Sequence, residues 1–387
     1  MNKYILYITL FLSVVFSCTV KTTDQLFKIN PNGIIHQSYA LSDLANEIRY
    51  VPLDNEQIIP FISEIELSNN KFFLNIKEGK LLAFNRDGTF DRFIGQKGHG
   101  PGEYVAVAAF AIDEQDRMVY VLDHRNIRQY SFDGDFVKNI SLEKFGADFY
   151  NILFQDDKLY LFEYLYYGHS KYNWLILDKN GNEIASKMNS IKPFKTGWPG
   201  PHKTSYKLDN EIKYWNMYND TIFTIQSTVY KPYILFDKGN HRCPQQKSYS
   251  IDYDKYWYPD GIIETKKYLF INSLWKGCRQ LFCLDKQDNQ MCLIDKELIG
   301  EDWEMKYGID NNLDGGPYLE PTFYFQINNE EYLVSSINAF DLKAHVASEA
   351  FKNSTPKYPE KKSELEKLAN NLNDNDNPVL MLVKLKE

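Results

Sequence analysis

The chain has 387 residues, of which 43% are hydrophobic and 15% aromatic, including 28 Tyr and 25 Phe. Aromatic side chains favour half-buried, pleated surfaces, and β-rich domains run long as single units, so one large β domain accounts for this length and composition. The formal net charge of -8 offers no basic field for a phosphate backbone and excludes nucleic acid from the expected partners.

The chain begins with a predicted secretion signal, residues 1–17. A short, positively charged start, residues 1–3, precedes an apolar run, residues 4–15, which is too short to span a bilayer. Residues 15–18, Val-Phe-Ser-Cys, resemble the lipobox of bacterial lipoproteins. The resemblance implies cleavage before Cys18, lipid attachment to Cys18, and an outer-membrane protein that faces the periplasm and meets the membrane only through this lipid. An ordinary signal peptide with a chance cysteine is the alternative.

Residues 18–27 form the expected linker from the lipid, and residues 28–387 form a single expected domain. A repeat defines its architecture: an apolar strand, a polar turn ending in glycine and a second strand recur at residues 81–90, 127–136 and 174–183. The turn glycines Gly88, Gly134 and Gly181 are 46 and 47 residues apart, which is the length of one four-stranded propeller blade. We therefore predict an all-β fold, a six-bladed β-propeller.

In chain order, a short helix at residues 42–47 and a strand at 48–53 are expected to precede the first blade. The strands predicted for each blade are 62–67, 71–76, 81–85 and 90–94 in blade 1; 118–122 within 106–142 in blade 2; 158–162 within 149–188 in blade 3; 206–208, 212–216, 221–226 and 230–236 in blade 4; 261–264, 267–271, 280–284 and 290–294 in blade 5; and 322–327, 331–336 and 342–347 in blade 6.

Blade 6 shows only three clear strands, and both ends of the chain offer strand-like segments, residues 47–53 and 378–385. Joining the two ends in one blade closes the ring and hides its edges, so we expect closure by N- and C-terminal strands. Residues 361–372 place leucines at helical spacing, which predicts a short C-terminal helix packed on the ring.

The linker between blades 1 and 2, residues 93–104, reads Phe-Ile-Gly-Gln-Lys-Gly-His-Gly-Pro-Gly-Glu-Tyr. It resembles the G-x-x-G-x-G-P-G-E-[YF] signature of a family of bacterial six-bladed β-propeller lipoproteins, which is related to NHL-repeat and TolB-like propellers. The resemblance covers most of the mature chain, including Asn377-Pro378 before the last strand, and departs from the family in blades 4 to 6. It implies a propeller in the cell envelope that binds a ligand or partner.

Linkers of this kind lie where a propeller channel opens, so they supply the candidate ligand site. His99 and Tyr104 lie on the first linker, and Trp198 and His202 lie on the linker after blade 3, residues 193–202. Together with the segments around Trp215 and Trp257, these four residues are expected to form an aromatic-lined channel mouth for a small molecule, glycan or protein partner. The alternative is a structural crossover that needs glycine for tight packing.

Residues 310–315, Asp-Asn-Asn-Leu-Asp-Gly, match the first half of a calcium-loop pattern. The candidate calcium ligands are Asp310, Asn312 and Asp314. The twelfth position is Pro321, which cannot supply the usual bidentate carboxylate, and Glu320 comes one residue early. A turn-rich loop without metal is the alternative.

The mature chain also carries Cys243, Cys278, Cys283 and Cys292. An oxidising compartment would allow up to two disulfides among them, and buried thiols are the alternative. Cys283 and Cys292 flank a turn at residues 285–289, which places them on adjacent antiparallel strands where a bridge is feasible.

No familiar hydrolase motif occurs in the sequence, and we assign no catalytic residue. The expected function is that of a lipid-anchored envelope binding protein whose channel face recognises its ligand. Two alternatives stay open: a calcium-assisted hydrolase or lyase on a propeller, and a scaffold subunit of an envelope complex.

Overall fold

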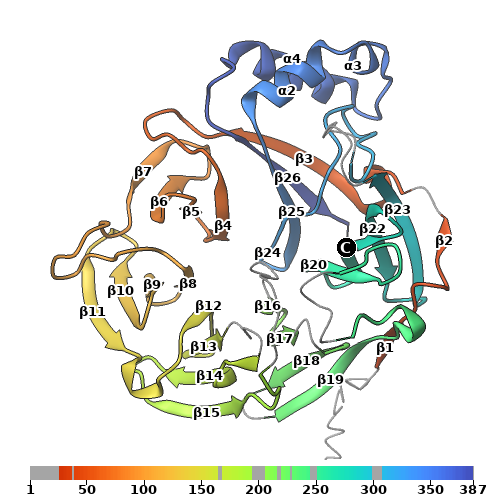
Figure 1. Ribbon diagram of the computed structural model, residues 1–387. Helices are drawn as coiled ribbons and strands as arrows, with labels where there is room; N and C mark the ends of the chain where they lie inside the picture. Colours follow the sequence, from red (N-terminus) through yellow and green to blue (C-terminus); the bar gives the residue numbers. More distant parts are fainter. Residues whose placement is uncertain are drawn as a thin grey trace, which may run out of the picture.

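The computed structural model describes residues 26–36, 39–163, 168–193, 205–215, 219–226, 229–244, 251–298 and 307–386 (Figure 1). Six antiparallel sheets stand around a central axis, and the helices α2, α3 and α4 gather at one place on the outer edge of the ring. This is the predicted six-bladed β-propeller. The predicted signal peptide and most of the predicted linker, up to residue 25, lie outside the described residues.

Blades 1 to 5 each contain four antiparallel strands in sequence order, with the first strand of each blade nearest the axis. Their strands are β4 (Ile62–Leu67), β5 (Lys71–Ile76), β6 (Lys80–Asn85) and β7 (Phe90–Phe93) in blade 1; β8 (Ala109–Asp113), β9 (Met118–Asp123), β10 (Asn126–Ser131) and β11 (Phe136–Ser141) in blade 2; β12 (Phe149–Gln155), β13 (Lys158–Glu163), β14 (Tyr172–Asp178) and β15 (Glu183–Met188) in blade 3; β16 (Ser205–Leu208), β17 (Glu211–Trp215), β18 (Thr221–Gln226) and β19 (Val229–Phe236) in blade 4; and β20 (Tyr258–Glu264), β21 (Tyr268–Trp275), β22 (Cys278–Asp285) and β23 (Gln290–Leu298) in blade 5.

Blade 6 is built from both ends of the chain, as predicted. Its order from the axis outward is β24 (Phe323–Ile327), β25 (Glu330–Ile337), β26 (Val379–Leu385) and β3 (Ala45–Pro52). The C-terminal strand β26 pairs antiparallel with the N-terminal strand β3, with Val379 opposite Pro52 and Val383 opposite Ile48. The ring is therefore closed by hydrogen bonds between segments more than 300 residues apart.

The predicted strand at residues 342–347 is wrong, because this segment belongs to helix α2 (Ala339–Ala347). Its buried residues, Ala339, Leu342 and Val346, recur three and four positions apart, which places them on one helical face. The place in the sheet beside β25 is taken by β26 instead. Two further helices follow, α3 (Glu349–Asn353) and α4 (Pro359–Asn371), and α4 confirms the helix predicted near the C-terminus.

The N-terminal segment also contributes two short strands that the sequence did not reveal. Strand β1 (Phe27–Ile29) pairs in parallel with β19, and β2 (Ile35–His36) pairs in parallel with β23. The short helix α1 (Leu41–Leu44) then leads into β3. We call residues 27–52 the N-terminal belt, because they run along the outer edges of blades 4 and 5 before entering blade 6 (Figure 1).

The repeated turn that predicted the blades has one geometry in all three places. Gly88, Gly134 and Gly181 have φ angles of 93°, 88° and 85°, a region that strongly favours glycine. In each turn the glycine N–H donates to the carbonyl three residues earlier at 3.0 Å. A Cβ atom on any of the three would overlap the outer strand of the preceding blade, so the position requires glycine for space as well.

Cationic side chains tie the same turns to the preceding blade. Arg49 on β3 donates to the carbonyl of Arg86 at 3.0 Å, and Arg92 on β7 donates to that of Asp133 at 3.0 Å. Lys138 on β11 reaches the carbonyl of residue 179 at 2.8 Å. Blades 6, 1 and 2 thus each supply a cation for the turn of the next blade, and charge-assisted hydrogen bonds of this kind are the stronger ones.

The apolar core is divided among the boundaries between neighbouring blades. Six clusters of buried side chains lie at these boundaries, and the one between blades 1 and 2 includes Phe73, Phe110 and Tyr130. The cluster between blades 5 and 6 also takes in the inner faces of the helices. The blades are therefore held together by sheet-on-sheet packing around the whole ring.

Asn377, just before β26, fastens the closure. This side chain is 6% exposed; its Nδ2 donates to the carbonyls of Asp54 at 2.5 Å and Gln57 at 2.6 Å, and its Oδ1 accepts from the N–H of Ile59 at 2.8 Å. We expect Asn377→Ala to lower the free energy of unfolding by about 2–4 kcal/mol, because three backbone groups lose their partner. Denaturant titration measures this.

The matched control is Asn373→Ala, since the Asn373 side chain is exposed and bonds only to nearby Asp376. This change should stay within about 0.5 kcal/mol of the parent chain. Equal losses in both variants would contradict a special role for Asn377.

Candidate functional site

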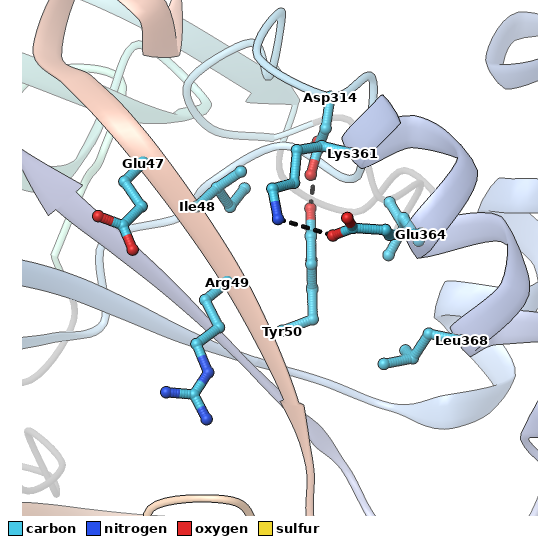
Figure 2. A pocket seen from close by; sticks show the side chains of 9 residues that line it. Glu47, Ile48, Arg49, Tyr50, Asp314, Lys361, Glu364 and Leu368 are labelled. Atoms are coloured by element: carbon cyan, nitrogen blue, oxygen red, sulfur yellow. Dashed lines mark hydrogen bonds and ion pairs between the residues drawn. The ribbon is translucent and has the colours of Figure 1, made fainter. Parts of the chain in front are cut away.

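A pocket of about 350 Å³ lies between β3, the outermost strand of blade 6, and helix α4 (Figure 2). Ligand pockets in proteins usually measure about 300–1,000 Å³, so this one has room for a small molecule. The two elements that line it, β3 and α4, lie at the outer edge of the propeller, away from the central axis (Figure 1). We call it the rim pocket.

Strand β3 supplies one wall of the rim pocket. Successive side chains of a strand point to opposite faces, so Ile48 and Tyr50 project toward α4 while Glu47 and Arg49 project from the other side of the strand (Figure 2). Pairing with β26 fixes the direction of each of these side chains. The wall toward the helix is therefore apolar apart from the Tyr50 hydroxyl.

Helix α4 supplies the opposite wall. Lys361, Glu364, Leu365 and Leu368 all line the pocket, and their spacing of three and four residues puts them on one helical face. Leu365 is 1% exposed and belongs to the core cluster between blades 5 and 6, where Leu368 packs as a partly buried residue. The two leucines thus form the apolar side of the pocket and anchor the helix to the ring.

Asp314 lies at the inner end of the pocket, beside Tyr50 (Figure 2). Its Oδ1 accepts hydrogen bonds from Asn311 Nδ2 at 2.7 Å, from the N–H of Gly316 at 2.9 Å and from the Tyr50 hydroxyl at 3.3 Å. Its Oδ2 is buried and has no hydrogen-bond partner among the residues that the structure describes. A buried carboxyl oxygen without a donor is costly, and a proton on it reduces that cost.

The pKa values of this pair follow from its burial. Loss of solvent raises the pKa of Asp314 above its usual value, although the hydrogen bonds from Gly316, Tyr50 and Asn311 oppose the shift. Burial and the nearby Asp314 carboxyl raise the pKa of Tyr50 well above its usual value, so the phenol keeps its proton. The inner end of the pocket therefore offers a phenol that keeps its proton and a carboxyl that holds a proton more tightly than a carboxyl in water.

The mouth of the pocket is charged. Lys361 Nζ and Glu364 Oε2 form an ion pair at 2.7 Å on the exposed side of α4, where solvent leaves it little net stabilising effect. Glu47 and Arg49 border the pocket along β3, but their side chains project from the other face of the strand, where Arg49 donates to the carbonyl of Arg86. An apolar wall, a buried polar end and a charged mouth together suit an amphipathic molecule.

The loop predicted to bind calcium contacts the N-terminal belt instead. Asp310 is exposed, and its carbonyl accepts from the N–H of Leu41 at 2.7 Å. Asn312 Oδ1 accepts from the N–H of Ser42 and Asn312 Nδ2 donates to Ser42 Oγ, each at 2.9 Å. Asp314 bonds to Tyr50, so the side chains of Asn312 and Asp314 both have partners within the protein, and calcium binding by this loop stays a prediction. No group of three or more His, Cys, Asp or Glu side chains that could hold a metal occurs in the described ranges.

The signature linker brings His99 and Tyr104 to different environments. His99 is exposed, whereas Tyr104 is 1% exposed and packs edge-on against Tyr130 in the core between blades 1 and 2, with ring centroids 6.1 Å apart. The Tyr104 hydroxyl accepts from the N–H of Leu81 at 3.1 Å. Tyr104 therefore joins two blades, and its side chain presents no accessible surface to a ligand.

Glutamate and glycine in the same linker also have structural contacts. Glu103 accepts from the N–H of Gly100 at 2.8 Å, and the carbonyl of Tyr104 accepts from the N–H of Gly98 at 2.9 Å. A Cβ atom on Gly98 would overlap the Glu103 carboxylate. These contacts support the alternative of a structural crossover for this run.

The remaining candidates for the channel mouth fall in two groups. Trp198, His202 and the lipid-attachment residue Cys18 lie outside the described residues. Trp215 and Trp257 are 3% and 1% exposed and belong to the core between blades 4 and 5. The channel-mouth site thus stays a prediction for which the described residues supply one exposed member, His99.

Sequence reasoning missed the lining residues of the rim pocket other than Asp314. The segment around Tyr50 was predicted as a strand and the segment around Leu365 as a helix, but nothing in either predicts that they face each other. They come together only when blade 6 closes. The one available signal was the expectation that both chain ends meet in that blade.

The fold defines this chain as a six-bladed β-propeller with a small helical cap on its closing blade. Residues 26–384 match the family described as Domain of unknown function (DUF4934), and the chain belongs to that family. In the described part of the chain, no helix is long and apolar enough to cross a membrane.

Among solved structures, the chain is similar to a protein of Bacteroides fragilis NCTC 9343, BF0058, which is described as a candidate exported protein. The two share 21% sequence identity with a TM-score of 0.69, over 94% of this chain and 100% of the other. This likeness shows a common fold. A weaker match is BamB from Moraxella catarrhalis, with 10% sequence identity and a TM-score of 0.36 over 75% of this chain and 72% of the other. Another is the WD40 propeller domain of Doa1, with 10% sequence identity and a TM-score of 0.37 over 75% of this chain and 81% of the other. No curated protein matches the chain.

The contrast between Tyr104 and His99 can be measured. We expect Tyr104→Phe to lower the free energy of unfolding by about 1–3 kcal/mol, because the N–H of Leu81, which is fully buried, loses its acceptor. His99→Ala changes an exposed residue in the same linker and should stay within about 0.5 kcal/mol. If the two variants unfold at the same denaturant concentration as the parent chain, the hydroxyl is not a structural contact.

Asp314 should make stability depend on pH. Its raised native pKa means that the native state binds a proton more tightly than the unfolded state, so its contribution is complete below the unfolded value of about 3.9 and is lost as pH rises through the native pKa. We expect the stability of the parent chain relative to Asp314→Asn to fall across this window, with a slope of at most about 1.4 kcal/mol per pH unit.

Taking the difference between parent and variant at each pH removes the shared titration of all other groups. Glu366→Gln, which removes a carboxyl at an exposed position on α4, serves as the matched control. A flat difference for Asp314→Asn would show that the Asp314 carboxyl is ionised alike in both states.

Proposed function

We propose that this chain is an exported, lipid-anchored protein of the cell envelope that binds a small amphipathic molecule in the rim pocket. The observation that carries the proposal is the pocket itself, about 350 Å³, with leucines on one side and the Tyr50–Asp314 pair at its inner end. Pockets with mostly apolar walls and a few convergent polar groups are typical ligand sites.

The cellular location rests on the N-terminal sequence. Residues 1–17 have the order of a secretion signal, and Cys18 follows it in a run that resembles a lipobox. The similar Bacteroides fragilis protein is described as a candidate exported protein, which agrees with this location. Attachment through Cys18 would leave the propeller in the aqueous phase, facing the periplasm from the outer membrane.

The ring supports binding by holding the pocket in shape. One wall is a strand inside the closing sheet, and the other is a helix whose leucines reach the core between blades 5 and 6. Both walls are thereby immobilised before a ligand arrives, which lowers the entropy cost of binding.

A thermal-shift screen tests the proposal. The probes are small molecules with one apolar and one polar end: short-chain fatty acids, aromatic amino acids and primary alkyl amines. A ligand at a hundredfold excess over its Kd should stabilise the protein by about 2.7 kcal/mol, which is a measurable rise in Tm. The expected result is a Tm rise for at least one of these classes.

Two variants of α4 locate the site. Leu368→Trp places an indole in the pocket and should abolish the Tm rise, whereas Lys367→Trp adds the same group at an exposed neighbouring position and should preserve it. A rise that survives in Leu368→Trp would place the ligand elsewhere, for example at the channel mouth. No rise with any probe class would contradict the binding of small amphipathic molecules.

A further inference from the structure

Two cysteines of blade 5 face each other across neighbouring strands. Cys283 on β22 and Cys292 on β23 are direct register partners, and the structure holds both as thiols. Residues directly opposite each other in an antiparallel pair have side chains on the same face and Cα atoms about 4.5–5.5 Å apart. Disulfides span Cα separations of about 4.4–6.8 Å, so the Cα spacing expected for register partners falls within the range of a disulfide.

We propose that Cys283 and Cys292 are joined by a disulfide in the exported protein. In the step, each thiol gives up its proton and the two sulfurs bond to each other. The two electrons pass to the disulfide of a thiol–disulfide exchange catalyst, which becomes a dithiol. This inference rests on the proposed export, because a reducing compartment would keep both residues as thiols.

The geometry of β22 favours the pair Cys283–Cys292 over the pair Cys278–Cys283. Cys278 lies five residues before Cys283 on the same strand, so the two point to opposite faces of the sheet and are separated by about 16 Å. The register partner of Cys278 is Leu298, whereas that of Cys283 is Cys292. A bond from Cys278 to Cys283 is therefore excluded, and Cys292 is the cysteine placed to pair with Cys283.

The bond would secure the place where the N-terminal belt crosses blade 5. Cys292 is also the register partner of Ile35 on β2, so β23 is held by β22 on one side and holds the belt on the other. Tyr39, a few residues further along the belt, hydrogen-bonds to the Cys292 sulfur. A covalent link between β22 and β23 would keep this edge of the blade in register for the belt.

Burial of the two thiols determines at which stage of folding the disulfide forms. Each of the two residues is 1% exposed, and burial raises the pKa of both thiols, while the thiolate is the reacting form. We therefore expect oxidation during folding and slow reaction once blade 5 is complete. The reduced folded protein should lose these thiols at least tenfold more slowly than the chain refolding in the same oxidant.

The cleavage pattern of trypsin makes the bond easy to detect. Cleavage after Arg279, Lys286 and Lys296 gives two peptides, residues 280–286 and 287–296, that contain only Cys283 and only Cys292. The full chain is reduced, denatured, refolded in a buffer of oxidised and reduced glutathione, alkylated in denaturant and digested without reductant. The expected result is a joined mass, which is the mass of the two peptides linked by a disulfide. On reduction, this species should give the two separate peptides.

Matched variants decide the assignment. The joined mass should persist in the double variant Cys243→Ser with Cys278→Ser, and it should vanish in Cys283→Ser and in Cys292→Ser. Alkylated peptides 280–286 and 287–296 from natively refolded protein would overturn the proposed geometry, and so would a join of either peptide to one carrying Cys243 or Cys278.

A second sample separates the geometry from the compartment. The full chain is recovered from the envelope of producing cells in the presence of an alkylating agent and mapped in the same way. A joined mass from both samples supports the proposal. The disulfide-linked peptide pair could form on glutathione refolding while the envelope sample contains alkylated cysteines. This result would overturn the disulfide in the cell and count against the proposed export, while leaving the blade geometry intact.

Discussion

The pairing of β3 with β26 is the interaction on which the rest of this structure depends. Without it, blade 6 would keep only β24, β25 and β26, and β26 would expose an open edge at the outside of the blade. The five residues from Val379 to Val383 are at most 4% exposed, so the last strand is buried between its neighbours. Closure also brings β3 to the face of α4, and the rim pocket exists only in the closed ring (Figure 2).

The sequence predicts the blades well because the local signals there agree with the fold. Gly88, Gly134 and Gly181 end turns of identical geometry, and alternating or buried runs flank them. Prediction from the sequence fails where the local residue pattern indicates one element and the packing of the whole domain favours another. Residues 342–347 contain apolar residues that read as a strand, yet a helix satisfies them and β26 fills the sheet. Strands β1 and β2 have three and two residues, too few to show a periodic pattern, and their partner strands lie more than 200 residues further along the chain.

The candidate site shows why residue patterns alone mislead. The Asp-x-Asn-x-Asp-Gly order of residues 310–315 is required by a tight loop whose side chains bond to nearby backbone, and calcium is one of two ways to satisfy it. Here Asn312 bonds to Ser42 and Asp314 bonds to Tyr50, so the N-terminal belt supplies partners for two of these side chains. Likewise, the glycine-rich linker serves the packing of Tyr104 between blades 1 and 2. In both segments the residue pattern predicts a tight turn of the backbone, but it does not determine which groups the side chains bind.

Arg49 connects the pocket to the architecture of the ring. It lies in the wall of the rim pocket and also donates to the turn of blade 1, the same contact that Arg92 and Lys138 make to the next two blades. A ligand that fills the pocket would therefore contact the strand that closes the ring and the helix that covers it, and the same strand carries the cation that joins blade 6 to blade 1. Because such a ligand binds only the closed form, its binding free energy adds directly to the stability of the closure.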